Sequence, residues 1–257
     1  MCFSAEASFG TGVVLSIVGI ATIHQSRSKN QLLFAGIPLI LAFQQMIEGY
    51  LWIALLNPAY SAWQQAATYI FLILAQVVWP TWIPLAIMLI KNEPRCKQLL
   101  KGVLVMGIII SSYLAYRLLT QSVWAQISGN HIDYHIGEIN KMLHLSAMVY
   151  FLVTTIPAFL SSVKKMWLFG LSVGVSYLIT NFFYERYVLS VWCFFAAVVS
   201  IVVFTIIFRL KDRQMRFVPY RNILWDNMLF KTSSNTGLTS IIMNTNISMS
   251  RVSVPRR

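Results

Sequence analysis

Seven long apolar stretches alternate with short polar segments along this chain. They cover residues 8–23, 32–56, 63–90, 99–119, 142–160, 166–184 and 189–210. Each is close to the ~20 residues that a helix needs to cross the hydrocarbon core of a bilayer. The pattern therefore predicts an all-α fold in which residues 1–210 form one polytopic membrane domain, a seven-transmembrane-helix bundle.

Basic residues collect in alternate segments between these stretches. Seventeen of the twenty Lys and Arg residues lie between stretches 1 and 2, 3 and 4, or 5 and 6, or at or after the end of stretch 7. The remaining three are Arg117, Lys141 and Arg186. Because cytoplasmic loops carry the excess of positive charge, the pattern places the N-terminus outside and the C-terminus in the cytoplasm.

Composition also favours a membrane protein over a soluble one. The chain is 57% apolar and 11% charged, which leaves too little polar surface for a water-soluble fold. Its net charge of +12 would suggest nucleic acid binding in a soluble protein. Here membrane topology and attraction to anionic lipid headgroups at the cytoplasmic face explain the basic residues. We therefore expect the lipid bilayer as a partner and no nucleic acid.

Two segments are longer than tight turns. Residues 121–141, on the outer side, are long enough to hold a helix of their own or a lid. In the basic cytoplasmic tail, residues 211–257, apolar residues are spaced by three and four over 217–230, which indicates a helix in the headgroup layer. The rest of the tail is rich in Ser, Thr and Asn and is typical of disorder.

Prolines interrupt several of the predicted helices. Pro38, Pro80, Pro84 and Pro157 fall within stretches 2, 3 and 5, and each removes a backbone N–H that a helix would use. We expect the third helix to be kinked. Gln76 lies one turn before Pro80, so its amide either bonds the backbone freed by the kink or takes part in binding.

Glu48 is the strongest candidate for a functional residue, because it is the one acidic residue in a predicted span. An unpaired carboxylate in hydrocarbon is costly, so Glu48 must have a partner or be protonated. Gln44 and Gln45 lie four and three residues earlier, on the same helical face, and form a polar patch with it. A binding role and a hydrogen bond that only packs two helices together are both open.

Depth in the membrane identifies other residues that can join Glu48. The fifth and seventh helices begin on the outer side, which puts His144 and Trp192 near the depth of Glu48. Gln76 and Trp79 of the third helix reach the same region. We therefore predict an outer-facing polar vestibule that binds a ligand, lined by Glu48, Gln44, Gln45, Gln76, Trp79, His144 and Trp192.

The three cysteines leave their pairing open. Cys96 falls in a cytoplasmic loop, where thiols stay reduced, whereas Cys2 and Cys193 belong to the oxidising side. A disulfide between Cys2 and Cys193, simple packing, and a chemical role for these thiols all fit the sequence.

The outer loop also carries candidate metal ligands. His131 and His135 are four residues apart, and Glu138 follows three residues later. On a short helix these side chains would share one face and could bind Zn²⁺. Solvated loop histidines are the alternative interpretation, and no other cofactor is predicted.

Four separated motifs resemble those of one family. They are MCFSAEASF at residues 1–9, the segment 37–52 with its two glutamines and Glu48, the Trp79-Pro80 step, and SVWCFFAA at residues 190–197. Together they resemble a group of bacterial multi-pass membrane proteins of unknown function that open with MCFSAxASF. The tail after Lys211 shows no such resemblance. The resemblance implies a protein of the bacterial inner (plasma) membrane and supplies no substrate.

No complete catalytic signature accompanies these features. A retinal protein is excluded, because residues 189–208 contain no Lys for a Schiff base. We therefore expect an integral membrane protein that binds or senses a small molecule or a lipid. The alternatives are a membrane hydrolase or transferase that uses a metal or Cys and His side chains, and a small-solute transporter.

Overall fold

The computed structural model describes residues 4–90, 92–129, 131–137, 141–183 and 195–217. The longer helices are α1 (Ala5–Gln25), α3 (Ile37–Leu56), α6 (Pro94–Thr120), α7 (Lys141–Leu160), α8 (Met166–Phe183) and α10 (Ala196–Phe217). The shorter helical elements are η1 (Lys29–Gln31), α2 (Leu32–Ala35), η2 (Pro58–Trp63), α4 (Gln64–Leu72), the π-helix η3 (Ile73–Val78) and α5 (Trp79–Leu89). Two strands, β1 (Val123–Ser128) and β2 (His131–Ile136), lie between α6 and α7.

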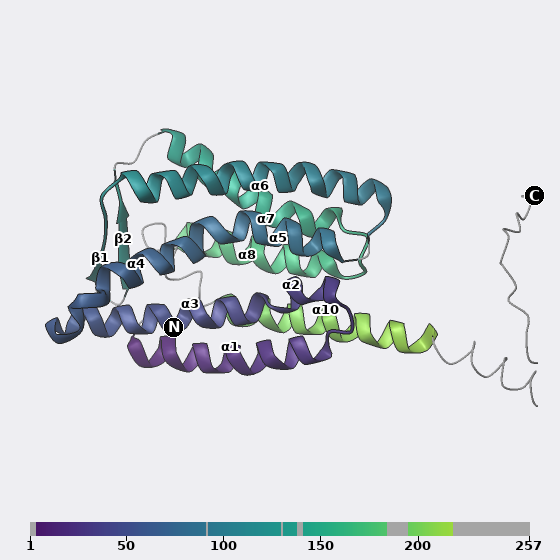
Figure 1. Cartoon of the computed structure of the whole chain (residues 1–257), viewed down its shortest axis with the longest axis horizontal. Helices are drawn as coiled ribbons and strands as arrows, with labels where there is room; N and C mark the ends of the chain where they lie inside the picture. Colours follow the sequence, from purple (N-terminus) through teal and green to yellow (C-terminus); the bar gives the residue numbers. More distant parts are fainter. Residues whose placement is uncertain (1–3, 91, 130, 138–140, 184–194, 218–257) are drawn as a thin grey trace, which may run out of the picture. The chain divides into compact units, whose positions relative to one another are not determined.

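Contacts group the chain into two units, Met1–Arg213 and Gln214–Arg257, and most of the second lies outside the described residues. Within the first unit, the long helices run back and forth (Figure 1), and helices adjacent in sequence pack in pairs, such as α1 with α3, α5 with α6 and α7 with α8. Beyond Phe217, the predicted interfacial helix and the rest of the tail lie outside the described residues.

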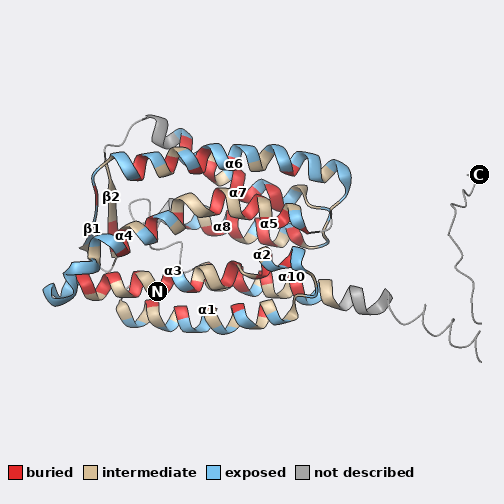
Figure 2. Ribbon diagram, viewed as in Figure 1, coloured by how far each residue is buried: buried red, intermediate tan, exposed pale blue. Residues whose placement is uncertain are grey.

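Four helical segments in the described part of the chain are long and apolar enough to cross a membrane. They are Ala5–Gln25, Lys29–Leu56, Pro58–Leu89 and Pro94–Thr120, and two shorter apolar helices are Leu145–Leu160 and Met166–Thr180. Many residues of α1 and α6 are exposed (pale blue in Figure 2), and they include large apolar ones; Ile17 is 64% exposed and Ile109 is 57% exposed. Such surfaces are unfavourable in water and suit lipid.

Glycines set the distance between α1 and α3. A Cβ atom added at Gly19 would lie 2.5 Å from Cδ2 of Leu39 and 3.0 Å from the backbone N of Leu39. On the partner helix, a Cβ at Gly49 would lie 3.1 Å from the ring of Phe9. Side chains of each helix therefore pack against bare backbone of the other, as small residues allow in membrane bundles.

The second apolar stretch is not one continuous helix. α2 ends at Ala35, and α3 begins after Gly36, which places Pro38 in the first turn of α3. A proline is well tolerated there, because N–H groups in the first turn have no acceptor within the helix. The expectation that Pro38 bends a helix from within is therefore wrong.

The third stretch is interrupted by the π-helix η3, which ends just before Trp79 and Pro80. With the i→i+5 spacing of a π-helix, the next hydrogen bond would join the N–H of residue 80 to the carbonyl of Ala75, but proline has no N–H. The hydroxyl of Tyr150, on α7, donates to this carbonyl at 2.7 Å. The donor therefore comes from another helix and not from Gln76, whose side chain is half-buried.

Helix α6 supports the other half of the kink. The hydroxyl of Ser111 donates to the carbonyl of Val77 at 2.7 Å. Pro84, inside α5, cannot donate to the carbonyl of Pro80, and this carbonyl faces Gly107. A Cβ atom at Gly107 would lie only 2.0 Å from the Pro80 oxygen. Helices α5 and α6 are thus in backbone contact at this level.

Residues 121–141 hold a β-hairpin and not the predicted helix, so the fold is mostly but not wholly α-helical. The strands pair in antiparallel register, with Val123 opposite Ile136 and Ser128 opposite His131. Gly129, in the turn, has a φ of 61°, a conformation that favours glycine. Alternation along each strand gives the hairpin one apolar and one polar face.

The apolar face of the hairpin packs on the bundle and covers one end of it, as a lid would (Figure 1). Val123 and Ile132 are buried there in a cluster with Leu51 of α3 and Phe71 of α4. The ring of Tyr134 stacks on that of Phe71, with centroids 4.6 Å apart.

Loops that carry Lys and Arg meet at the other end of the first unit (Figure 1). Asn92, after α5, accepts a hydrogen bond at 2.7 Å from the hydroxyl of Ser161, after α7. Lys211 of α10 donates to the side-chain oxygen of Gln25, at the end of α1. The two ends of the unit therefore differ in both structure and charge.

Candidate functional site

Helix α3 carries a buried polar cluster. Gln44, Gln45 and Glu48 are each at most 3% exposed. The Gln45 amide donates to Oε2 of Glu48 at 3.2 Å, because residues three apart lie on the same face of a helix. All three side chains also make further interactions, so none of them is unpaired. The bundle therefore meets the cost of burying a carboxylate in part through a neighbour on the same helix.

Gln44 lines a small cavity between the helices that is partly open. The cavity has a volume of about 60 Å³. Its lining comes from α3, η3, α5, α8 and α10, and consists of Ile37, Leu41, Gln44, Ala75, Trp79, Ile83, Phe169, Val173, Ala196 and Val199. Most of these side chains are apolar, while Gln44 supplies an amide and Trp79 an indole. In size and chemistry this lining suits a small, mostly apolar molecule with one hydrogen-bonding group.

The structure brings together some of the predicted site residues and separates others. Gln44 and Trp79 line the same cavity, whereas Gln76 is half-buried outside its lining. Gln45 and Glu48 are buried beside Gln44 but do not line the cavity. Trp192 and the side chain of His144 lie outside the described residues.

Several lining residues were not predicted from the sequence. Phe169 and Val173 come from α8, and Ala196 and Val199 come from α10. Each is one of many similar residues in its apolar stretch, and apolar periodicity does not tell which helices meet. No local signal marks these positions.

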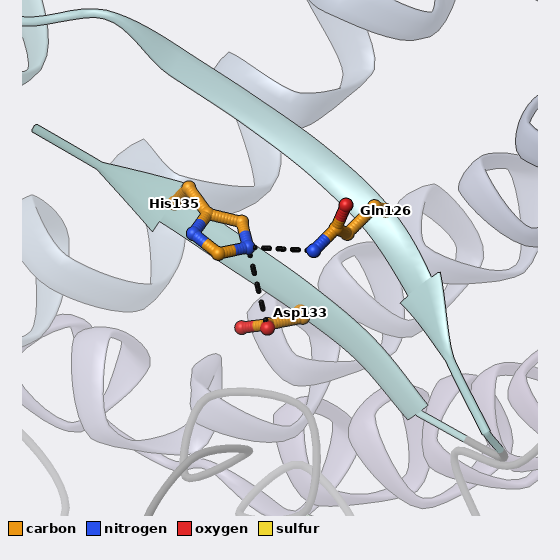
Figure 3. Close-up of polar contacts among 3 residues, drawn as sticks. All are labelled: Gln126, Asp133 and His135. Carbon is orange, nitrogen blue, oxygen red and sulfur yellow. Dashed lines mark hydrogen bonds and ion pairs between the residues drawn. The ribbon is translucent and has the colours of Figure 1, made fainter.

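The polar face of the hairpin forms a second cluster (Figure 3). Nε2 of His135 lies 3.3 Å from Oδ2 of Asp133 and 2.9 Å from the amide nitrogen of Gln126. The His135 ring stacks on Trp124, with centroids 4.8 Å apart and planes 9° apart. Both polar contacts involve the same ring nitrogen, Nε2. The arrangement orients an imidazole as an Asp–His pair does.

The strand geometry changes the interpretation of the candidate zinc ligands. On a helix, His131 and His135 would have Cβ atoms about 6 Å apart, but on β2 they are roughly 13 Å apart along the strand. They cannot share one ion in the way the predicted helix would allow. Glu138 lies outside the described residues. Among the residues that are described, no three His, Cys, Asp or Glu side chains come close enough to hold a metal.

Burial lowers the pKa of His131 from its ordinary value of 6.5. The folded hairpin therefore favours the neutral imidazole. The unfolded chain binds a proton more readily, so this contribution to stability is present above pH 6.5 and is lost as the pH falls below it.

Arg117 ties the base of the hairpin to α6. Its guanidinium is buried and donates from Nη2 to the side-chain oxygen of Gln121 at 2.8 Å and to the carbonyl of Ile136 at 3.0 Å. This arginine, one of the three predicted to face outside, thus has a structural role at the hairpin end.

Of the three cysteines, the structure describes Cys96. Cys96 has a free thiol and is half-buried in the first turn of α6. Cys2 and Cys193, for which a disulfide is one of three open interpretations, lie outside the described residues.

Comparison with known proteins gives a family and no relative of known activity. No curated protein matches the chain, and no solved structure matches it. A model described as a family of unknown function (DUF6629) matches residues 1–217, which includes α1 to α10, the cavity lining and the hairpin. The chain therefore belongs to this family of unknown function, DUF6629.

Proposed function

We propose that this chain is a seven-span protein of the bacterial inner membrane, with its N-terminus outside and its C-terminus in the cytoplasm. The charge pattern supports this orientation, because the described loops that carry Lys and Arg lie at one end of the first unit and the hairpin lies at the other. Anionic lipid headgroups would then contact the basic end.

Reporter fusions test the topology. A reporter fused after Arg257 is expected to be active in the cytoplasm, and one inserted at Gly129, in the exposed turn of the hairpin, is expected to be active outside. Activity of both reporters on the same side would overturn the seven-span assignment.

We further propose that the protein binds a small molecule or a lipid chain in the cavity beside Gln44, and acts as a sensor of that ligand. The observation that carries this proposal is the lining, which has one amide among apolar side chains within a membrane-type bundle. An amide in an otherwise apolar lining orients a ligand, because it is the group there to which a polar end of the ligand can turn.

The size of the cavity limits the ligand. About 60 Å³ is less than half of the ~150 Å³ of an engineered cavity that admits benzene. A short alcohol, or the end of an aliphatic chain with one polar group, suits this space. Gln45 and Glu48 support the site by lying next to Gln44 on α3, where they extend its polar environment away from the cavity.

Fluorescence quenching by 2-bromoethanol tests binding, because its hydroxyl suits Gln44, its two-carbon chain suits the small cavity, and its bromine quenches a nearby tryptophan. We expect saturable quenching in the purified protein and loss of the saturable part in Trp79→Phe. Val199→Phe should also abolish it, because Val199 lines the cavity.

Val198→Phe is the matched control. Val198→Phe makes the same change in size at the adjacent position of α10, where Val198 is 49% exposed. The tryptophan fluorescence of Val198→Phe should be quenched in the same saturable way as that of the unmodified protein. Quenching that never saturates, or that Val199→Phe and Val198→Phe reduce equally, would overturn the cavity as the binding site.

A hydrolase or transferase is the second candidate, and the Asp133–His135 pair on the hairpin favours it. Metal analysis of the purified protein separates the two functions. One equivalent of zinc that is lost in His135→Ala would support the enzyme, whereas a metal-free protein with saturable quenching would support the sensor.

A further inference from the structure

We propose that η3 is a relay through which occupancy of the cavity controls the β-hairpin. This inference rests on the proposed function, since it assigns a response to the same cavity. In outline, a ligand in the cavity holds η3 in its π register, and this register in turn positions α4 under the hairpin.

The wall of the cavity includes η3 and the first residue of α5. Ala75 lies in the π-helix and Trp79 follows its end, and both side chains line the cavity. A change from π to α spacing removes the extra residue from this turn, so it must rotate Ala75 relative to Trp79. A ligand that fits the present wall therefore stabilises the π register, because it binds that conformation better than the other.

The π register has a specific polar partner. In this register the carbonyl of Ala75 loses its donor at Pro80, and the hydroxyl of Tyr150 replaces it at 2.7 Å. With the i→i+4 spacing of an α-helix, the carbonyl without a backbone donor at Pro80 would be that of Gln76. The carbonyl of Ala75 would then bond the N–H of Trp79, and the Tyr150 hydroxyl would lose its acceptor. Tyr150 therefore selects one register over the other.

Helix α5 is held on α6 by hydroxyl and backbone contacts, whereas α4 packs on α3 and on the hairpin mainly through apolar side chains. Ser111 donates to the carbonyl of Val77 and lies 3.0 Å from the hydroxyl of Thr81, and Gly107 lies against the carbonyl of Pro80. These contacts hold the C-terminal half of the kink on α6. A register change in η3 is then expressed as movement of α4, on the N-terminal side.

Helix α4 contacts the hairpin directly. The side-chain amide of Gln65 donates to the carbonyl of Val123 at 2.9 Å. The ring of Phe71 stacks on Tyr134 with the two planes 7° apart. One residue of register corresponds to about 100° of rotation and 1.5 Å of translation along a helix, which neither contact can tolerate. The hairpin is therefore tightly packed when the cavity is occupied and looser when it is empty.

Hydrogen exchange over residues 123–136 measures this coupling. In the unmodified protein, saturating 2-bromoethanol should slow exchange of these amides at least threefold. Tyr150→Phe should speed their exchange at least threefold without the alcohol. Tyr177→Phe, a matched change on α8 where the ring stacks on Phe151, should behave as the unmodified protein does.

A variant at the far end of the relay separates coupling from binding. Gln65→Ala should leave the saturable quenching of Trp79 unchanged but abolish the effect of the alcohol on hairpin exchange. Gln64→Ala removes the preceding amide, which makes no hydrogen bond to the described residues of the hairpin, and should keep the response. If Tyr150→Phe does not fold, Ser111→Ala tests the same segment, with the same expected rise in exchange.

The outcomes distinguish the two proposals. Saturable quenching with unchanged hairpin exchange would overturn the relay and leave the cavity as a binding site. No saturable quenching would overturn the binding function and the relay with it. Equal responses in Gln65→Ala and Gln64→Ala would show that α4 does not carry the signal, which also overturns the relay.

Discussion

The α1–α3 pair and the α5–α6 pair both pack closely, but they reach close packing in different ways. Between α1 and α3 the helices are regular, and glycines admit side chains, such as Leu39 against Gly19. Between α5 and α6 the α5 side is irregular, and Gly107 admits a backbone carbonyl of Pro80. Side chains can rotate away from a new contact, whereas a carbonyl in a packed helix cannot.

The difference explains where polar side chains are needed. A regular helix satisfies its own backbone, so α3 can devote Gln45 and Glu48 to each other. A helix with a π turn and two prolines exposes carbonyls, so its neighbours must provide hydroxyl groups, as Tyr150 and Ser111 do. The cavity lies against this irregular segment, where the backbone does not fill space as evenly.

The largest effect is expected at the rigid contact. Gly107→Ala would place a Cβ atom 2.0 Å from the Pro80 oxygen and should force α5 and α6 apart, at a cost of about 3 kcal/mol. Thermal unfolding in detergent micelles measures the loss. Gly102→Ala on the same helix meets nothing within 4 Å and should not destabilise the protein. Equal melting temperatures for the two variants would mean that the contact is not rigid.

The buried carboxylate of α3 should come next. Glu48→Leu leaves the Gln45 amide without its acceptor and is expected to cost on the order of 1–3 kcal/mol. Glu48→Gln keeps the size and an acceptor oxygen and should fold normally, while altering any ligand response that depends on the titratable proton. Thermal unfolding compares the two variants. A Leu variant as stable and responsive as the unmodified protein would remove Glu48 from the site.

The flexible contact between α1 and α3 should cost less. Gly19→Ala meets the Leu39 side chain at 2.5 Å and its backbone N at 3.0 Å, so part of the strain can be relieved by rotation, and about 1–2 kcal/mol is expected. Gly10→Ala, with nothing within 4 Å, is the control on the same helix. Chemical or thermal unfolding reports the difference. A larger loss here than in Gly107→Ala would reverse the comparison of the two helix pairs.

The smallest effect should come from one hydroxyl at the kink. Ser111→Ala removes the hydrogen bond to the carbonyl of Val77 and is expected to cost about 1 kcal/mol. Ser112→Ala changes the next residue, which is exposed, and should have no effect. If Ser111→Ala and Ser112→Ala shift the melting temperature equally, the effect comes from the helix propensity of alanine and not from the hydrogen bond at the kink.

Long-range features of the fold were harder to predict than local ones. Apolar stretch length predicted the positions of α1, α6, α7 and α8, because each helix needs a continuous apolar segment. The π-helix could not be predicted, since its stability depends on Tyr150 and Ser111, which are distant in sequence. The cavity has the same origin, because five elements contribute to it.

The hairpin was missed for a different reason. Residues 123–128 and 131–136 alternate apolar and polar side chains, as strands do, and Gly129 marks the turn between them. The spacing of four between His131 and His135 was interpreted with a helical period, although four is also an even number and fits one face of a strand. For the site, the sequence predicted that Glu48 lies within the bundle, because a carboxylate in a membrane span needs a partner. The sequence did not show that Glu48 would lie outside the cavity lining.

Asn92 has a consequence for how the sequence of this chain can change. Its side-chain nitrogen donates to the carbonyls of Ile87 and Ile90, at 2.7 and 2.8 Å, while its oxygen accepts from Ser161 and Ser162. Asp has no donor for the first pair, Ser is too short to span both, and Gln would displace the amide by a methylene group. A polar loop position of this kind would ordinarily be among the most freely exchangeable in a membrane protein. In this chain we expect Asn92 to be among the positions that tolerate substitution least.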